Sequence, residues 1–424
     1  MVPNYRRVWL AVVVALALAV VPAAQGQTDW ASEHWVGTWT ASMHGQISFA
    51  GRNFPNDGFE NQTVRMIVHT TIGGHRVRVR VSNAFGATPL TVGAAHIALR
   101  SSGSAIVPAS DRPLTFSGRP AITIPAGAEV LSDAVDLDVP QSGDLAISIY
   151  APAKTGPATW HSTGLHTTYI SGPGDFTSQA EIAGATTQAC WYWIEGVDVT
   201  APQETAAVVT FGDSITDGAR STVDANHTWP SELAERLLTG RGHTEQIAVL
   251  NAGISGNRIW HDMIGPNGLE RFGHDALAQA GVRDVVVLLG INDIGFSNIP
   301  GVVADQAVSA EDVIAGLDQF IVRAHVRGLR VIGATLLPFE GATYYSSDAE
   351  QKRAAVNTWI RTSGAYDGLI DFDATMRDPQ HQTQLLAAFD SGDHLHPNDA
   401  GYKAMGDSIN LLLFAQGKQR KKHE

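Results

Sequence analysis

The chain has 424 residues, of which 44% are hydrophobic and 17% are charged, so it is long enough for two globular domains and too apolar to be disordered. Its formal net charge of −13 disfavours nucleic acid or an anionic membrane surface as a partner, because both attract basic proteins. The single cysteine, Cys190, excludes an intramolecular disulfide and a cluster of thiolate metal ligands.

Residues 1–26 are typical of a secretory signal peptide. Arg6 and Arg7 precede the apolar run of residues 8–21, and the small residues of "PAAQG" follow it. The run is shorter than the roughly 20 apolar residues of a transmembrane helix, so a retained membrane anchor is the weaker alternative. We therefore expect cleavage near Gly26, a secreted or periplasmic protein, and no stable membrane insertion after cleavage.

Residues 27–204 are predicted to form a β-sandwich or jelly-roll-like domain. The run "RVRVRVS" at residues 76–82 alternates valine with arginine, as a half-buried strand requires. The run "RMIVHTT" at residues 65–71 precedes it across "IGG", which predicts a hairpin connection between the two strands. Further β-like runs follow between Pro, Gly and Ser clusters, and no long stretch has a helical period.

Residues 205–416 are predicted to form an α/β domain, and residues 417–424 are a basic tail to which we assign no function. Short apolar runs alternate with helix-like segments, and these runs lie at residues 207–211, 247–251, 285–289, 330–337 and 368–372. Nearly continuous apolar strands between helices are typical of a parallel sheet that is covered on both faces. One helix-like segment starts with Ser309 and Asp312, which resemble a capping box.

The chemistry-bearing residues follow the ends of these predicted strands. Ser214 in "GDSITDG" follows the first strand, Gly256 in "AGISGNR" the second, and Asn292 in "GINDIG" the third. Asp393 and His396, in "DSGDHLHPNDAGY", come after the fifth strand and before the last helix. Ligands of an open α/β sheet bind beyond the carboxyl ends of the strands, so we expect these residues to converge there.

This set of residue types is what hydrolytic acyl transfer requires. A serine hydroxyl needs a base to remove its proton, an imidazole base needs a carboxylate to orient it, and the oxyanion needs N–H donors. Each motif alone is weak evidence, since a serine after a strand is more often a helix cap and a glycine pair is more often a turn. The order and placement of the motifs carry the prediction.

The segments "FGDSITDG", "NAGISGN", "GIND" and "DHLHP" resemble the four sequence blocks of the SGNH (GDSL-type) hydrolase superfamily, in the same order. The resemblance implies a flavodoxin-like three-layer α/β/α domain with Ser214 as nucleophile, His396 as general base and Asp393 as its orienting carboxylate. It also implies an oxyanion hole from the backbone N–H groups of Ser214 and Gly256 and the side-chain amide of Asn292. The upstream β-domain looks like one that precedes this domain in some secreted bacterial members.

Four other residues compete with these assignments. The Asp-x-x-His spacing of the superfamily leaves His394 as a bystander or a pocket-wall residue. Asp213 and Asp293 suggest a metal site, but no His or carboxylate pattern with metal-ligand spacing accompanies them. We interpret both as turn-fixing residues and expect no metal and no cofactor. A second copy of "GDSI" contains Ser408 in a run with helical spacing, so we expect no catalytic role for it.

Five residues are candidates for a substrate pocket. Trp260 and His261 lie near the glycine loop, and Phe339, Tyr344 and Tyr345 follow the fourth strand. These side chains suit a short acyl chain or a sugar ring, so we predict a secreted serine esterase for small-molecule or carbohydrate esters, with acetyl groups on polysaccharide as one candidate. One alternative is a longer-chain lipase or an acyltransferase, which we rank lower because no segment of the sequence reads as a long amphipathic lid. Another alternative is a carbohydrate-binding protein whose β-domain carries the main role.

Overall fold

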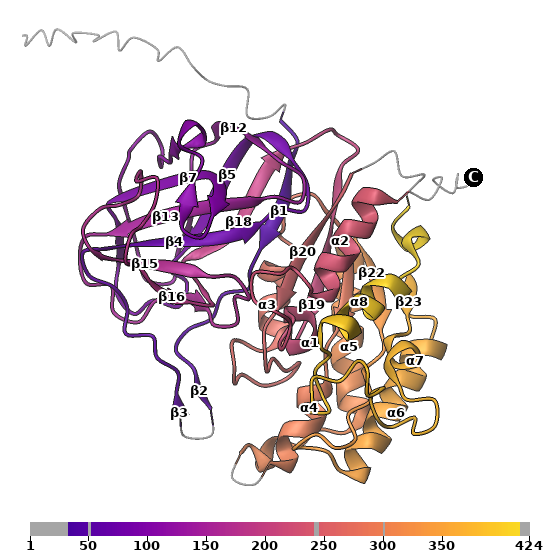
Figure 1. Cartoon of the computed structure of the whole chain (residues 1–424). Coiled ribbons are helices and arrows are strands. Elements are labelled where there is room, and N and C mark those ends of the chain that lie inside the picture. The colour runs from indigo at the N-terminus through magenta and orange to yellow at the C-terminus, as the bar shows by residue number, and fades with distance from the viewer. Residues whose placement is uncertain (1–32, 50–51, 241–245, 300–301, 416–424) are drawn as a thin grey trace, which may run out of the picture. The chain divides into compact units, whose positions relative to one another are not determined.

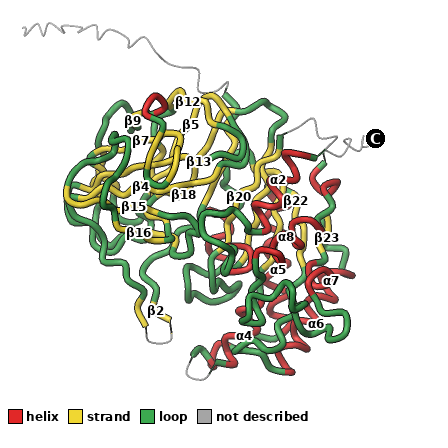
Figure 2. The backbone as a smooth tube through the Cα atoms, viewed as in Figure 1, coloured by secondary structure: helices red, strands yellow, loops and turns green. Residues whose placement is uncertain are grey.

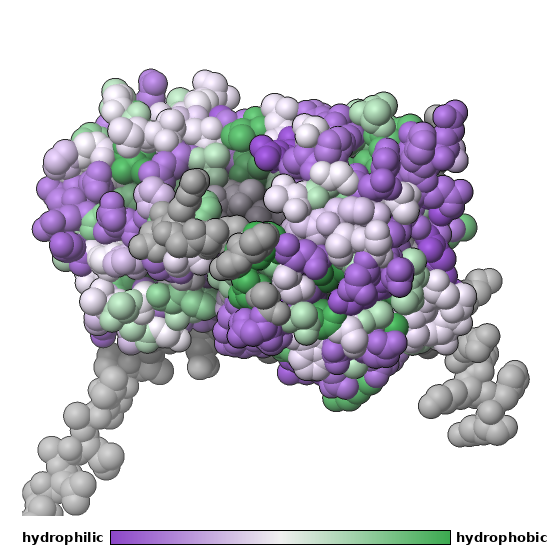
Figure 3. Space-filling view, turned by 90° about the horizontal axis from the view of Figure 1, so that it is seen from below, coloured by the Kyte–Doolittle hydropathy of each residue, from purple (hydrophilic) through white to green (hydrophobic). Residues whose placement is uncertain are grey.

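The computed structural model describes residues 33–49, 52–240, 246–299 and 302–415 (Figure 1). The predicted signal peptide and the basic tail lie outside the described residues. Residues 34–424 form one compact unit, which holds an antiparallel β-rich part followed by a parallel α/β part. In the described ranges, no helix is both long and apolar enough to span a bilayer. Hydrophilic residues cover much of the face shown in Figure 3, and hydrophobic ones gather in smaller patches between them.

The β-rich part is built from two antiparallel sheets (Figure 2). The first sheet holds β1 (Trp35–Thr40), β18 (Ile194–Thr200), β5 (Gly74–Ser82) and β11 (Glu129–Leu131), with β12 (Val135–Val139) also on β5. The second holds β16 (Thr186–Gln188), β15 (Thr168–Pro173), β4 (Gln62–His69), β13 (Asp144–Ala151), β7 (Ala94–Ser102) and β8 (Ala105–Ile106), with β9 (Arg112–Pro113) on β7. Three short pairs complete this part: β2 (Ser48–Phe49) with β3 (Arg52–Asn53), β6 (Leu90–Val92) with β10 (Ile122–Ile124), and β14 (Trp160–His161) with β17 (Trp191–Tyr192).

The alternating strand is confirmed, whereas the predicted hairpin is wrong. The three valines of β5, at positions 77, 79 and 81, have no exposed surface. However, β4 pairs with β13 and β15, and β5 pairs with β18, β11 and β12, so the two strands lie in different sheets. The N–H of Thr71 donates to Thr38 O and the N–H of Ile72 donates to Thr38 Oγ1 (both 3.0 Å). These bonds hold the connection against β1 where the chain passes from one sheet to the other. A short turn-like segment between two β runs cannot distinguish this crossover from a hairpin.

The α/β part has a five-stranded sheet in which every neighbouring pair is parallel. Its order is β20 (Ile247–Gly253), β19 (Ala206–Gly212), β21 (Val282–Leu288), β22 (Arg330–Ala334) and β23 (Gly368–Ile370). Each apolar run that predicted a strand forms one. This is the flavodoxin-like order 2-1-3-4-5, in which ligands bind at the switch point beside the first strand.

Helices cover both faces of this sheet (Figure 1). On one face α2 (Trp229–Thr239) packs against α8 (Asp399–Ser408), and on the other α5 (Ala310–Val326) contacts both α3 (Gly268–Asp275) and α6 (Ser347–Thr362). The predicted capping box is present at the start of α5, where Ser309 and Asp312 cap each other's backbone. The shorter helices are α1 (Ser214–Asp217), α4 (Ile291–Gly295), α7 (Phe372–Met376) and the 3-10 turns Pro108–Ser110, Phe296–Asn298, Ala304–Gln306 and Leu411–Phe414.

The β-rich part covers the edge strand of the parallel sheet. Strand β1 packs on β20 so closely that a Cβ atom at Gly37 would lie 2.8 Å from Leu250 Cδ1. The hydroxyl of Thr71 accepts a hydrogen bond of 3.2 Å from the N–H of Val249 in that edge strand. An uncovered edge strand presents unpaired N–H groups to other chains. The two parts therefore share an interface that buries this edge and satisfies one of its donors.

We expect Thr71→Val to lower the free energy of unfolding by about 1–3 kcal/mol, because valine keeps the shape but leaves the Val249 N–H without its partner and removes one of two hydrogen bonds to the Thr38 carbonyl. Urea denaturation with a shared slope measures the change. Thr91→Val is the control, since its hydroxyl pairs only with Thr123 at the surface, and its effect should stay below about 0.5 kcal/mol. Equal losses in the two variants would contradict the interface argument.

Candidate active site

Ser214 lies at the carboxyl end of β19, where the chain leaves the sheet and begins α1. Asp213 caps this helix, because its Oδ1 accepts a hydrogen bond of 3.1 Å from the N–H of Ile215. The N–H of Ser214 is in the first turn, where no preceding helical turn supplies an acceptor. The serine thus presents both a hydroxyl and a backbone donor at the switch point of the sheet.

A hydrogen-bonded chain connects Ser214 to an imidazole and a carboxylate. Ser214 Oγ lies 2.8 Å from His396 Nε2, and His396 Nδ1 lies 2.8 Å from Asp393 Oδ2. The other carboxylate oxygen, Oδ1, accepts from the backbone N–H groups of His396 (2.9 Å) and Leu395 (3.1 Å). The three residues are therefore within hydrogen-bond reach of one another, as acyl transfer by a serine requires of its nucleophile, base and orienting carboxylate.

Asp393 is held in its ionised form. Burial would raise the pKa of Asp393, but the hydrogen bonds from the ring and backbone of His396 outweigh it and keep the pKa well below its usual value. Arg220 adds a positive charge, with Nε 3.1 Å from Asp393 Oδ2. The carboxylate can therefore fix the tautomer of His396 and stabilise the imidazolium. Sequence reasoning missed Arg220, whose only signal was a charge just beyond "GDSITDG".

His394 has a different partner. Its Nδ1 lies 2.6 Å from Asp390 Oδ2, and its side chain is 54% exposed. Its φ of +60° is in the left-handed region, which non-glycine residues rarely adopt. The imidazole that reaches Ser214 is that of His396, in agreement with the Asp-x-x-His spacing.

Two glycines let the loop after β20 pass close to α1. Gly256 has a φ of +80°, a conformation that glycine adopts without a steric cost. At Gly253, a Cβ atom would lie 2.3 Å from the backbone nitrogen of Asp217, so no larger residue fits. The Gly256 N–H belongs to a loop that is anchored against the helix of Ser214.

The side-chain amide of Asn292, on α4, has a defined orientation. Its Nδ2 donates to the carbonyl of Asn257 (3.0 Å), and its Oδ1 accepts from the hydroxyl of Tyr344 (3.3 Å). Because the amide nitrogen carries two hydrogens, one remains for a further acceptor. Burial raises the pKa of Tyr344 well above its usual value, so its hydroxyl remains a donor. Sequence reasoning placed Tyr344 in a pocket wall and missed this contact.

The five pocket candidates occupy different environments. Phe339 has no exposed surface and packs its ring against those of Tyr344 and Tyr345. Trp260 is 37% exposed, and its indole N–H donates to a backbone carbonyl of α5 (2.8 Å). His261 is partly buried, and burial lowers its pKa. The structure joins Tyr344 to the site through Asn292 and gives Phe339 a supporting position, and the pocket role of the five residues stays a prediction.

Residues 210–404 match the model of the GDSL-like Lipase/Acylhydrolase family. The α/β part of the chain therefore contains a GDSL-like Lipase/Acylhydrolase domain. The resemblance that the four motifs predicted is thereby confirmed, together with the parallel sheet and the preceding antiparallel β-rich part. None of the curated proteins that were compared with the chain matches it.

Solved structures similar to the chain share about half of its length. One is a putative lipolytic protein of the G-D-S-L family from Desulfitobacterium hafniense (21% identity, TM-score 0.37, covering 48% of this chain and 97% of that one). Another is the aryl esterase of M. smegmatis (16% identity, TM-score 0.38, 48% and 95%). A third is a variant of Axe2, an acetyl xylan esterase from Geobacillus stearothermophilus (21% identity, TM-score 0.39, 49% and 94%).

Two further carboxyl groups of the GDSL-like domain support its turns. Burial raises the pKa of Asp213 to about 7 and that of Asp293 to about 6. Asp293 accepts hydrogen bonds from the N–H groups of Ile259 (2.7 Å) and Trp260 (3.2 Å). With the helix cap that Asp213 provides, both residues hold backbone turns, as the sequence predicted.

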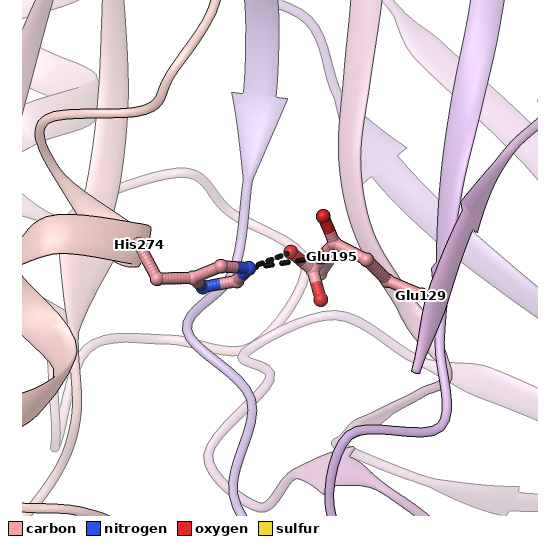
Figure 4. Close-up of side chains that lie close together, drawn as sticks. All are labelled: Glu129, Glu195 and His274. Atoms are coloured by element: carbon pink, nitrogen blue, oxygen red, sulfur yellow. Dashed lines mark hydrogen bonds and ion pairs between the residues drawn. The ribbon is translucent and has the colours of Figure 1, made fainter. Parts of the chain in front are cut away.

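A cluster of titratable groups joins the β-rich part to α3 (Figure 4). His274 Nε2 lies 2.8 Å from Glu129 Oε2 and 3.2 Å from Glu195 Oε1, and Nδ1 lies 2.9 Å from Asp275 Oδ1. Glu129, Glu195 and His274 are near enough to one another to hold a metal ion. However, the hydrogen bonds that His274 donates to Asp275 and the two glutamates raise its pKa to about 12, so the positive charge of the imidazolium balances the carboxylates without a metal ion. We interpret the cluster as an ion-pair network, which sequence reasoning missed because its members lie on separate elements.

We expect Tyr344→Phe to reduce the turnover of an ester substrate about tenfold with little change in KM, because the amide of Asn292 loses the bond that orients it. Steady-state kinetics on p-nitrophenyl acetate measure both constants. Tyr345→Phe is the matched control on the neighbouring ring. An unchanged kcat in Tyr344→Phe would show that Asn292 needs no such support.

Asp393→Asn should lower kcat by about 10³-fold or more, because an amide at this position cannot stabilise the imidazolium and favours the wrong tautomer. His394→Gln, which changes the exposed neighbouring imidazole, should stay within about threefold of the parent. The same ester assay compares both variants. The assignment of His396 as the base would be wrong if His394→Gln were the more damaging change.

Proposed function

We propose that the protein is a serine esterase that hydrolyses carboxylic esters with short acyl groups through an acyl-enzyme on Ser214. The observation that carries the proposal is the hydrogen-bonded chain of Ser214, His396 and Asp393 beside the Gly256 loop and the Asn292 amide. The proposal assigns Ser214 as the activated nucleophile and the N–H groups of this loop and of Asn292 as the donors to the oxyanion. The match of residues 210–404 to an acylhydrolase family supports this class of reaction and does not identify the ester.

In the proposed reaction, Ser214 Oγ attacks the ester carbonyl carbon while His396 Nε2 takes its proton. Asp393 stabilises the resulting imidazolium, and the oxyanion accepts hydrogen bonds from the N–H groups of Ser214 and Gly256 and from Asn292 Nδ2. The imidazolium then protonates the leaving alcohol as the acyl-enzyme forms. In the second half, His396 takes a proton from water as the water oxygen attacks the acyl carbonyl, and the bond to Ser214 Oγ then breaks while His396 returns the proton to Oγ, which releases the acid and restores the free enzyme.

The aromatic side chains packed beside Asn292 support a substrate with a short acyl group. The ring of Tyr344 packs against those of Phe296 (centroids 5.7 Å apart) and Phe339 (5.9 Å). A Cβ atom at Gly295 would lie 2.4 Å from the Tyr344 ring, so this side of the site is already filled. Acetyl esters, including those of carbohydrates, are the shortest members of the proposed substrate class.

We also propose that the protein is exported. The support is the sequence of residues 1–26, with its basic start, apolar run and small-residue end. N-terminal sequencing of the mature protein from the culture medium or the periplasm tests this directly. A protein that is found only inside the cell with Met1 retained would contradict export.

A rate series on p-nitrophenyl esters from acetyl to dodecanoyl tests the activity and the chain length. We expect a maximum at the short esters and a loss of about 10³-fold or more in Ser214→Ala. Ser408→Ala is a matched control, because Ser408 lies in the same tetrapeptide but donates to Met405 O at the end of α8. Near-normal activity of Ser214→Ala would overturn the proposal, and a maximum at long chains would favour a lipase. Acetylated xylan, assayed in parallel, tests the carbohydrate ester.

A further inference from the structure

A histidine of the β-rich part reaches the nucleophile helix. His161, in β14, places Nε2 3.0 Å from Oδ1 of Asp217, the last residue of α1. The other oxygen, Asp217 Oδ2, accepts from both the N–H (2.9 Å) and the hydroxyl (2.6 Å) of Ser255. Ser255 directly precedes Gly256. One carboxylate therefore connects the β-rich part, the helix of Ser214 and the loop that carries a proposed oxyanion donor.

This contact is buried and takes the form of an ion pair. His161 is 2% and Asp217 5% exposed. His161 Nδ1 lies 2.7 Å from the carbonyl oxygen of Ser42, which can only accept, and Nε2 faces a carboxylate that already accepts two hydrogens from Ser255. A hydrogen on each ring nitrogen gives both acceptors a donor, which is the protonated form of the imidazole. A buried imidazolium is stable here because its opposite charge is 3.0 Å away.

The surrounding titratable groups leave this proton on His161. Burial alone would lower the pKa of His161, but the charge and hydrogen bonds of Asp217 outweigh it and raise the pKa above its usual value. The nearest second imidazole is His44, with ring centroids 6.1 Å apart, and burial together with the charge of His161 lowers its pKa to about 3. Arg271, which donates to Ser42 Oγ (3.2 Å), lies on the same side and is paired with Asp275 at 3.0 Å. His44 is neutral and Arg271 bears a positive charge, so Asp217 is the counter-ion of His161.

We infer that His161 is a positioning residue for the oxyanion hole, which makes the β-rich part a working component of the acyl-transfer site. His161 fixes Asp217, and Asp217 fixes both the end of α1 and the backbone that leads into Gly256. An oxyanion donor is effective only when it lies about 3 Å from the developing charge, so a small shift of this loop lowers the rate. The inference rests on the proposed esterase function.

Other contacts already hold the two parts together, so attachment alone does not require His161. Strand β1 packs on β20, and the ion pairs of His274 join α3 to β11 and β18. What distinguishes His161 is its partner, because Asp217 binds Ser255, the residue directly before Gly256. A purely structural role predicts lower thermal stability only, whereas positioning predicts a change in kcat with KM nearly constant.

The test compares His161→Gln with His274→Gln in the full-length protein. Glutamine at 161 cannot donate in both directions, so we expect kcat on p-nitrophenyl acetate to fall about tenfold to a hundredfold, with KM within about twofold. The affinity for a boronic acid that forms a tetrahedral adduct on Ser214 should fall in parallel, since it mimics the oxyanion. His274→Gln, which removes another histidine that joins the two parts, should lower the melting temperature and keep kcat.

Ser255→Ala provides a second variant that perturbs the same connection from the loop side. It removes one of the two bonds to Asp217 Oδ2 and should lower kcat less than His161→Gln does. A full kcat in both His161→Gln and Ser255→Ala would overturn the inference, as would equal losses of kcat in His161→Gln and His274→Gln. If His161→Gln does not fold, full activity of Ser255→Ala alone overturns it. Activity that survives in Ser214→Ala identifies the separate failure of the esterase proposal.

Discussion

The active-site edge of the sheet depends on one buried guanidinium, that of Arg271. It donates to the carbonyls of Gly212 (2.8 Å) and Ala252 (2.8 Å), near the ends of β19 and β20, and to Asn257 Oδ1 (2.9 Å) in the glycine loop. Asp275, one turn along α3, balances its charge at 3.0 Å. Where two strands end and turn away from a sheet, their carbonyls lose the partners that the ladder supplied, and burying them unpaired is costly. Arg271 donates to the Ala252 carbonyl and gives the Gly212 carbonyl, which also accepts from the N–H of Ile254 (3.1 Å), a second donor at the place where Ser214 and the glycine loop leave the sheet.

The β-rich part supports both this end of the sheet and its edge strand β20. Arg271 reaches Ser42 Oγ at 3.2 Å, Thr71 accepts from the edge strand, and His161 pairs with Asp217. Each of these contacts places a polar group of the β-rich part against a backbone or a side chain that positions the site. A module whose main role was to bind carbohydrate elsewhere would need only an attachment surface. The polar, buried character of this interface indicates that the two parts are adapted to each other.

The regular features of the fold followed from the sequence because they depend on local patterns. The five parallel strands, the buried valines of β5 and the capping box at Ser309 each reflect a short-range period or spacing. The motifs at strand ends also indicated which side chains to compare, and the structure brings Ser214, Asp393 and His396 together.

The features that the sequence did not reveal are contacts between distant segments. His161 lies 56 residues from Asp217, and Ser42 lies 229 residues from Arg271. A histidine or a serine in a β run has no local mark of its partner, because pairing is decided by how the two parts dock. The wrong prediction of a hairpin has the same origin. Whether the connection forms a turn or a crossover depends on the strands that β4 and β5 pair with, and not on the residues of the connection.

The number of donors around each carboxyl group sets the charge near the nucleophile. Asp393 accepts from the ring and backbone of His396 and from Leu395 and Arg220, and it stays ionised. Asp213, next to Ser214, has a donor on Oδ1 only, and among the described residues its Oδ2 has no hydrogen-bond partner. Burial therefore raises its pKa to about 7. A neutral form of Asp213 is thus available near neutral pH, and it avoids placing a second uncompensated negative charge beside a developing oxyanion.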